Sequence, residues 1–216
     1  MARRTPELLV GADPIAEAAR LILELRPRTW ALAGGSTPRG LYGRLVRADL
    51  PWHEIECFFG DERCVPPNHP ASNFHMAHEA LLAHVPATVH AMPGETCDAE
   101  AYERLLRDRL GATPRLDLAL LGLGEDGHTA SLFPGDPALE ERERLVVRVE
   151  RPDFSRLTVT YPVLDAASVA LFLVVGESKR EALTQLLEGD DIPAARVASE
   201  RVIVVADHAA AGTDAQ

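Results

Sequence analysis

The chain has almost no lysine, few cysteines and no long apolar run. Of its 22 basic residues only Lys179 is a lysine. No apolar stretch approaches the roughly 20 residues of a membrane span, and the opening MARRTPELLV lacks an apolar segment of signal-peptide length. A net charge of -11 gives no basic face for nucleic acid or an anionic membrane. We therefore expect a cytoplasmic protein with neither of these as a partner.

The cysteines show no pattern of spacing that would indicate a disulfide framework or a zinc ribbon. Cys57, Cys64 and Cys97 are odd in number and scattered, and no two of them form a C-x-x-C pair. We therefore expect reduced thiols with a structural role.

Apolar runs alternate with helical patterns along the whole chain. Asp13 and Pro14 are typical of a helix start, and apolar residues follow them at helical spacing as far as Pro27. Further helices are expected over 37–46, 75–85, 98–110 and 178–187. Strand-like runs are TWALAGG, IECFFG, VHAMPG, LDLALLG, RLTVTY, VALFLVVG and RVIVVAD.

These runs are continuous rather than alternating, which is typical of a parallel sheet covered on both faces. We predict a doubly wound, mostly parallel α/β fold with helices on both faces of the sheet. Residues 1–208 form a single domain in this interpretation, and residues 209–216 form a frayed tail.

The first loop of chemical interest is AGGSTPRG, which follows a predicted strand. Gly34 and Gly35 allow a close approach of the backbone, and Ser36 or Thr37 would cap the next helix. Free amide groups and the helix dipole would then form a seat for a phosphate or carboxylate. An ordinary glycine turn with a helix cap explains the motif equally well. It is not a Walker loop, which would end in Gly-Lys-Ser/Thr.

A second loop, GDERCVPPNHPASN, places charged residues directly after a strand. Asp61, Glu62 and Arg63 are consecutive, and the prolines that follow exclude a regular helix. Such a rigid loop could hold charges over a site, although a solvated charged turn is the simpler interpretation.

The third loop, LGLGEDGHTASLFPG, contains the pattern G-x-G-x-x-G after an apolar run. A dinucleotide turn brings pyrophosphate against its glycines, but here Glu125 and Asp126 lie among them and Pro134 cuts short the helix that should follow. We interpret the glycine match as accidental. The loop instead presents His128, which is suited to proton transfer and has Asp126 to orient it. A surface or capping histidine is the alternative.

The single lysine lies in a fourth loop, VVGESKREALTQLL. Ser178 and Glu181 match a capping box, which would place Lys179 in the first helical turn, where a cation opposes the helix dipole. A bound anion would reverse that penalty, so Lys179 is a candidate phosphate contact. The alternative is a side chain extended into water.

Other chemistries have weaker support. The chain has no G-x-S-x-G nucleophile elbow. His75 and His78 lie one helical turn apart, but HMAHE matches no zinc motif, so we expect no metal site there.

Four of these stretches together resemble a known family. GGSTPRGLYGRL, GDERCVPPNHPASN, LGLGEDGHTASLFPG and RLTVTYPVLDAASVALFLVVGESKREAL are similar to the 6-phosphogluconolactonases of the pentose phosphate pathway, and the similarity runs from about Glu7 to Asp207. The resemblance implies the fold of glucosamine-6-phosphate deaminase. It also implies hydrolysis of 6-phospho-D-glucono-1,5-lactone to 6-phosphogluconate without metal or cofactor.

The same resemblance implies roles for individual residues. His128 would be the general base that activates water, and Asp126 and Asp61 would orient it or the sugar hydroxyls. Arg156 is a weaker candidate for substrate binding. The residues implied to bind substrate are Gly34, Gly35, Ser36, Thr37, Arg63, Gly127 and Lys179.

The closest alternative function is an amino-sugar phosphate isomerase or deaminase. In those relatives a glutamate that assists ring opening follows the Asp-Gly-His turn, and Phe133 stands at that position here. A non-catalytic sugar-phosphate-binding protein and a nucleotide-binding oxidoreductase are more distant alternatives. A monomer and a dimer are both compatible with the sequence.

Overall fold

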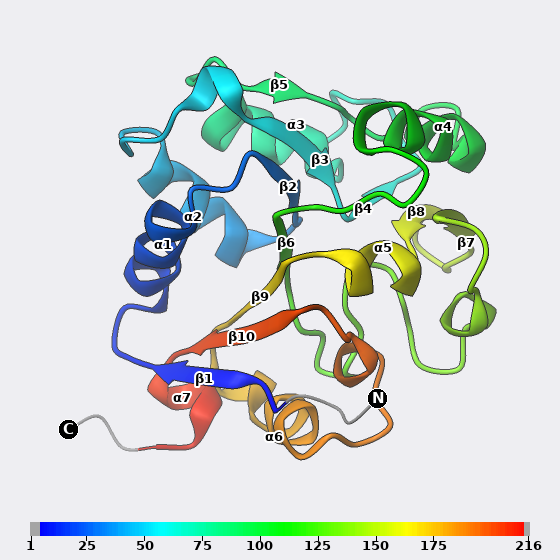
Figure 1. Ribbon diagram of the computed structural model, residues 1–216. Helices are drawn as coiled ribbons and strands as arrows, with labels where there is room; N and C mark the ends of the chain where they lie inside the picture. The colour runs from blue at the N-terminus through cyan, green and yellow to red at the C-terminus, as the bar shows by residue number, and fades with distance from the viewer. Residues whose placement is uncertain (1–4, 214–216) are drawn as a thin grey trace.

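A parallel sheet of seven strands forms the centre of the computed structural model, which describes residues 5–213 (Figure 1). Its strand order is β1-β10-β9-β6-β2-β3-β5, and every neighbouring pair is parallel. The strands β6 and β9 are buried along their whole length, which explains their unbroken apolar sequences. The strands of this sheet are β1 Glu7–Val10, β2 Thr29–Leu32, β3 Glu56–Phe59, β5 Thr88–Val89, β6 Leu118–Leu121, β9 Val169–Val174 and β10 Arg201–Ala206.

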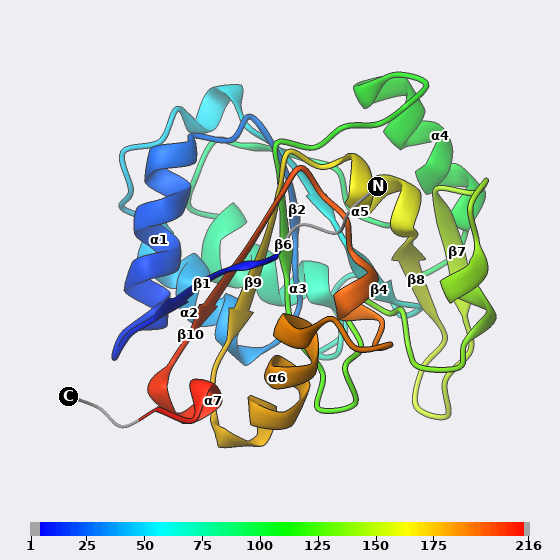
Figure 2. The same cartoon turned by 60° about the horizontal axis from the view of Figure 1, so that its bottom comes forward.

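Helices cover both faces of this sheet. In both views α1 and α2 lie on one side, and α4 and α5 lie on the other (Figures 1 and 2). The predicted doubly wound α/β fold is therefore confirmed. None of the helices between residues 5 and 213 is long and apolar enough to cross a membrane. The helices are α1 Pro14–Leu25, α2 Ser36–Leu45, α3 Asn73–Ala77, α4 Ala99–Leu110, α5 Tyr161–Ala166, α6 Arg180–Glu188 and α7 His208–Ala211, and a π-helical turn, His78–Leu82, follows α3.

The first helix shows how local sequence determines an element. The Asp13 side chain accepts a hydrogen bond from the Ala16 amide at 2.8 Å, and Pro14 occupies the first helical position, as predicted. Ala18 and Ile22, one helical turn apart, are fully buried on the face that packs toward the sheet.

The order of the strands reverses between β2 and β6. From β2 the chain adds β3 and β5 on one side, and from β6 it adds β9 and β10 on the other. The loops that leave β2 and β6 therefore diverge above the sheet, and such a reversal is where α/β sheets bind ligands.

A second, antiparallel sheet lies beside the first and corrects two expectations. It consists of β4 Asp61–Arg63, β8 Arg156–Val159 and β7 Val146–Val149, in the order β4-β8-β7. The run RLTVTY was expected in the parallel sheet, but it supplies the central strand here. The segment Asp61–Arg63 was expected as a loop. It is instead a strand that pairs with β8.

The described end of the chain, residues 208–213, differs from the expected tail. α7 is capped by the Asp207 side chain, which accepts a hydrogen bond from the Ala210 amide at 2.8 Å. The predicted frayed tail, 209–216, is thus helical at its start, and residues 214–216 lie outside the described part of the chain.

The cysteines also correct an expectation. Cys64 and Cys97 form a disulfide, with their Cα atoms 5.1 Å apart, and Cys57 is a free, buried thiol. Burial raises the pKa of the Cys57 thiol to about 12, so it stays protonated. The expectation of reduced thiols failed because the fold brings Cys64 and Cys97 together. Cys64 follows the end of β4, and Cys97 lies in the loop before α4.

The disulfide should contribute measurably to stability. We expect Cys97→Ser to lower the free energy of unfolding by about 2–4 kcal/mol, since the bond closes a loop between residues 33 apart. Urea unfolding of the two proteins, with and without dithiothreitol, measures this. If dithiothreitol lowered the stability of wild type and Cys97→Ser by the same amount, the pairing would be contradicted. A titration that finds more than one free thiol in the denatured, non-reduced wild type would contradict it as well.

Candidate active site

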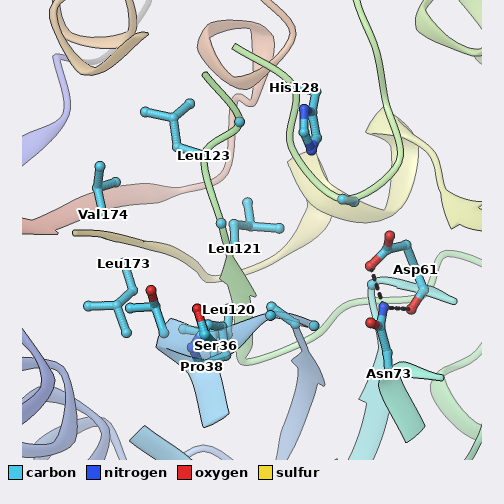
Figure 3. Close-up of a pocket in the computed structure, with 18 of the residues that line it drawn as sticks. Ser36, Pro38, Asp61, Asn73, Leu120, Leu121, Leu123, His128, Leu173 and Val174 are labelled. Atoms are coloured by element: carbon cyan, nitrogen blue, oxygen red, sulfur yellow. Dashed lines mark hydrogen bonds between the residues drawn. The ribbon is translucent and has the colours of Figure 1, made fainter. Parts of the chain in front are cut away.

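A cavity of about 290 Å³ opens at the carboxyl edge of the main sheet, where β2, β6 and β9 end (Figure 3). Segments far apart in the sequence supply its walls. Asp126 and Gly127, two of the predicted site residues, do not line it. The predicted residues that line it are Gly34, Gly35, Ser36, Thr37, Asp61, Arg63, His128, Lys179 and Arg156.

The loop after β6 presents His128 to this cavity (Figure 3). The ring nitrogen Nδ1 lies 2.6 Å from Asp126 Oδ1, and the same oxygen accepts the His128 backbone N–H at 3.1 Å. Burial acts to raise the pKa of Asp126, but these hydrogen bonds outweigh it and hold the pKa below its usual value. An ionised Asp126 requires the proton on Nδ1, which leaves the lone pair of Nε2 free to accept a proton.

The glycines of this loop make its geometry possible. A methyl group on Gly124 would lie 2.0 Å from His128 Nδ1 and 2.6 Å from Asp126 Oδ1. Gly127 has φ +79°, and a methyl group there would lie 2.7 Å from Ile192. The pattern G-x-G-x-x-G therefore serves the packing of the histidine loop in this chain.

Asp61 lies across the cavity from His128 and contacts other residues. Its Oδ1 accepts a hydrogen bond from Asn73 Nδ2 at 3.0 Å (Figure 3). Its Oδ2 accepts one from Ser131 Oγ at 2.6 Å. Gly34 fits only because it lacks a side chain, since a methyl group would lie 1.9 Å from Asn73 Oδ1. Asn73 and Ser131 were not predicted, and they fix the direction of the Asp61 carboxylate.

Two arginines line the cavity. Arg63 Nη1 donates to the Ala71 carbonyl at 2.6 Å, and Arg156 Nη2 donates to Asp153 at 2.7 Å. Within residues 5–213, the Nε atoms of both arginines are buried without a protein hydrogen-bond partner. A buried donor without an acceptor is costly, so both guanidinium groups carry unsatisfied hydrogen-bonding capacity beside the cavity.

Lys179 lies just before α6 and also lines the cavity. Its side chain is 26% exposed, and Nζ is 3.9 Å from Glu125 Oε1, which is at the limit of an ion pair. The predicted capping box of Ser178 does not form. A short 3-10 turn, Glu177–Lys179, precedes α6, so Lys179 itself occupies the N-cap position.

The start of α2 forms the wall beside Lys179. The N-cap residue is Gly35, with φ +105°, rather than Ser36 or Thr37. No side chain caps this helix, so its first amides are left available at the cavity. The prediction of a cap was wrong because the glycine turn places the hydroxyl residues one position further into the helix.

Phe133 packs against His128, although it does not itself line the cavity. Its ring is 5% exposed and its centroid lies 4.5 Å from that of His128. The guanidinium of Arg151 stacks on the ring at 4.1 Å, and that of Arg156 lies 5.3 Å from its centroid. An aromatic ring, and no carboxylate, therefore lies against the imidazole at this position.

The two histidines considered for a metal lie elsewhere. His75 pairs with Glu79 at 3.7 Å, and the ring of His78 lies 5.6 Å from that of Phe74. Residues 5–213 contain no group of three or more His, Cys, Asp or Glu side chains that could hold a metal ion.

The fold and the site together define a class of protein: a doubly wound α/β enzyme with a histidine–aspartate pair beside cationic side chains and free helix amides. The family model of glucosamine-6-phosphate isomerases/6-phosphogluconolactonase matches residues 10–205. The chain belongs to this family.

Relatives and solved structures agree with this assignment. A 6-phosphogluconolactonase from Nostoc sp. is 44% identical over 177 residues, covering 76% of this chain and 74% of the relative. The rat 6-phosphogluconolactonase is 40% identical over 207 residues, covering 86% and 80%. The structure of 6-phosphogluconolactonase from Trypanosoma brucei superposes with a TM-score of 0.85 at 29% identity, covering 98% of this chain and 99% of that one.

A monomeric glucosamine-6-phosphate deaminase has a similar fold, with a TM-score of 0.81 at 26% identity, covering 96% of this chain and 100% of the deaminase. The fold is therefore shared by both activities of the family, and the choice between them depends on the site.

The contact between Gly124 and the imidazole leads to a prediction. Gly124→Ala should displace the ring from Asp126, because the added methyl group would overlap Nδ1. We expect the imidazole of His128 to change from the Nδ1–H tautomer to a mixture of tautomers, as measured by nitrogen NMR. The signals of this imidazole are assigned by their absence in His128→Gln.

Gly122→Ala is the matched control, since nothing lies within 4 Å of the added carbon. An unchanged tautomer in Gly124→Ala would show that the histidine does not depend on this glycine.

Proposed function

We propose that this protein is a 6-phosphogluconolactonase that hydrolyses 6-phospho-D-glucono-1,5-lactone to 6-phosphogluconate in the oxidative pentose phosphate pathway. The observation that carries the proposal is that the imidazole of His128, oriented by Asp126, shares one cavity with Arg63, Arg156 and Lys179. The names of the relatives at 40–44% identity support the same activity.

In this mechanism His128 acts as the general base. Its Nε2 accepts a proton from a water molecule as the water oxygen attacks the lactone carbonyl carbon. The tetrahedral intermediate then collapses, the bond between this carbon and the ring oxygen breaks, and the ring oxygen takes the proton from the imidazolium. One water is consumed, and the acid product ionises. Asp126 stabilises the imidazolium between these two steps.

A lactone is an activated ester, so positioning and charge stabilisation can supply much of the remaining acceleration. The guanidinium groups of Arg63 and Arg156 line the cavity, so they are suited to bind the lactone or its developing oxyanion. Asp61, fixed by Asn73 and Ser131, would accept hydrogen bonds from sugar hydroxyls.

The phosphate would bind at the other end of the cavity. Lys179 supplies a cation there, and the free amides at the start of α2 supply hydrogen bonds together with Ser36 and Thr37. These contacts lie away from the reacting carbon, so their binding energy serves mainly to orient the lactone. Gly34 and Gly35 allow the ligand to approach the backbone.

Phe133 favours the lactonase over the isomerase or deaminase activity of the family. Ring opening of an amino sugar phosphate needs proton transfer to and from the sugar, and a phenyl ring against His128 cannot take part in it. Lactone hydrolysis needs only the histidine. A non-catalytic sugar-phosphate sensor on the same fold would bind the ligand without turnover.

We also propose that the catalytic unit is a single α/β domain, as the sequence predicts. One cluster of buried apolar side chains extends from Ala18 to Ala210 and includes residues of every strand that borders the cavity.

Replacing the base should remove most of the activity. We expect His128→Ala to lower the rate of lactone opening by about 10²–10⁴, toward the spontaneous rate, because general base catalysis contributes that much. The loss of freshly made lactone is followed by NMR for wild type, His128→Ala and the control His78→Ala, which changes a histidine outside the cavity. Equal rates for wild type and His128→Ala would reject the assigned base.

Removing the amine should affect binding more than chemistry. In Lys179→Ala we expect KM for the phosphorylated lactone to rise about tenfold or more, with a smaller change in kcat, since a charge-assisted contact to phosphate is lost. The preference for phosphorylated over unphosphorylated lactone should shrink accordingly. Arg180→Ala is the matched control, because Arg180 donates to the Ala209 carbonyl instead of lining the cavity. Full discrimination in Lys179→Ala would argue against a phosphate contact.

A further inference from the structure

Glu62 is a buried acid that the proposed chemistry does not use. It lies in β4 between Asp61 and Arg63, and it is 2% exposed. Glu62 does not line the active-site cavity, and it lines instead a second, mostly apolar cavity bounded by Val65 and Met92. Burial raises the pKa of Glu62, although its hydrogen bonds act in the opposite direction.

Four donors surround the Glu62 carboxylate. Oε1 accepts the backbone N–H groups of Arg63 and Asn73, each at 2.7 Å. Oε2 accepts the backbone N–H of Phe74 at 2.8 Å and the hydroxyl of Ser72 at 2.9 Å. A carboxylate that accepts from four donors has no capacity left for a ligand, so its role lies in what it joins.

The four donors belong to two separate segments. One is β4, which carries Arg63, and the other is the start of α3, residues 72–74. The guanidinium of Arg63 is itself anchored to this second segment, because Nη1 donates to the Ala71 carbonyl. The backbone and the tip of the Arg63 side chain are therefore held by two segments that Glu62 joins. Asn73 Nδ2 adds hydrogen bonds between the same segments, to the backbone oxygen and Oδ1 of Asp61.

We propose that Glu62 is a positioning residue that sets the Arg63 guanidinium in the substrate cavity by joining β4 to residues 71–74. This positioning role rests on the proposed function in one respect, because it assumes that Arg63 contacts the sugar phosphate. A neutral amide at position 62 would turn an NH2 group toward at least one of the backbone N–H groups, and the two segments would move apart.

The experiment is a double-mutant cycle on ligand binding. The affinity for 6-phosphogluconate is measured by calorimetry for wild type, Glu62→Gln, Arg63→Ala and the double variant, with lactone turnover followed in parallel. We expect Glu62→Gln to weaken binding about tenfold, and to change it less than twofold when Arg63 is already alanine, because residues that act through one another are not additive. Glu95→Gln changes an exposed acid that lines the second cavity; it is the matched control and should bind as wild type.

The outcomes separate the possible roles. If Glu62→Gln weakens binding equally with and without Arg63, or lowers only the unfolding temperature, the positioning role is overturned. If Glu62→Gln does not fold, Glu62→Asp takes its place in the cycle, since it keeps the charge but is one methylene too short to reach both segments. A wild-type protein that binds 6-phosphogluconate but does not open the lactone would reject the proposed function and leave the cycle interpretable.

Discussion

The reversal of strand order between β2 and β6 is the constraint on which the site depends. Because the two strands are adjacent and parallel, the loops that follow them leave the same edge of the sheet in opposite directions. One loop brings the glycine turn and the free amides of α2, and the other brings His128. The cavity lies between them because neither loop covers the edge they share, so the start of α2 and His128 line the same cavity without any long insertion.

Much of the fold could be predicted because its signals are local. The continuous apolar runs indicated buried parallel strands, and the Asp13–Pro14 pair indicated the start of α1. The second sheet could not be predicted in this way. β4 is a strand of charged residues, Asp61–Arg63, whose pairing with β8 bridges almost a hundred positions of sequence, and neither its composition nor its length distinguishes it from a polar turn. The Cys64–Cys97 disulfide was missed for the same reason.

The candidate site shows the same division. His128 and Asp126 are two residues apart, so their contact could be expected from the sequence, and the isolated lysine was visible by composition. Asn73 and Ser131 gave no comparable signal, since they reach Asp61 from 12 and 70 positions away. The predicted caps at Ser36 and Ser178 were wrong. Gly35, with a positive φ, is the N-cap of α2, and a short 3-10 turn after Gly176 places Lys179 at the N-cap of α6.

The scarcity of lysine makes selective chemical labelling at the cavity possible. Lys179 carries the only side-chain amine of the chain, and it is partly exposed inside the cavity. A reagent that acylates primary side-chain amines has a single such target per molecule, and under the proposed function a bound phosphate would compete with the reagent for it. The rate of acylation would then report occupancy of the cavity, without engineering of the rest of the surface, which is basic almost entirely through unreactive guanidinium groups.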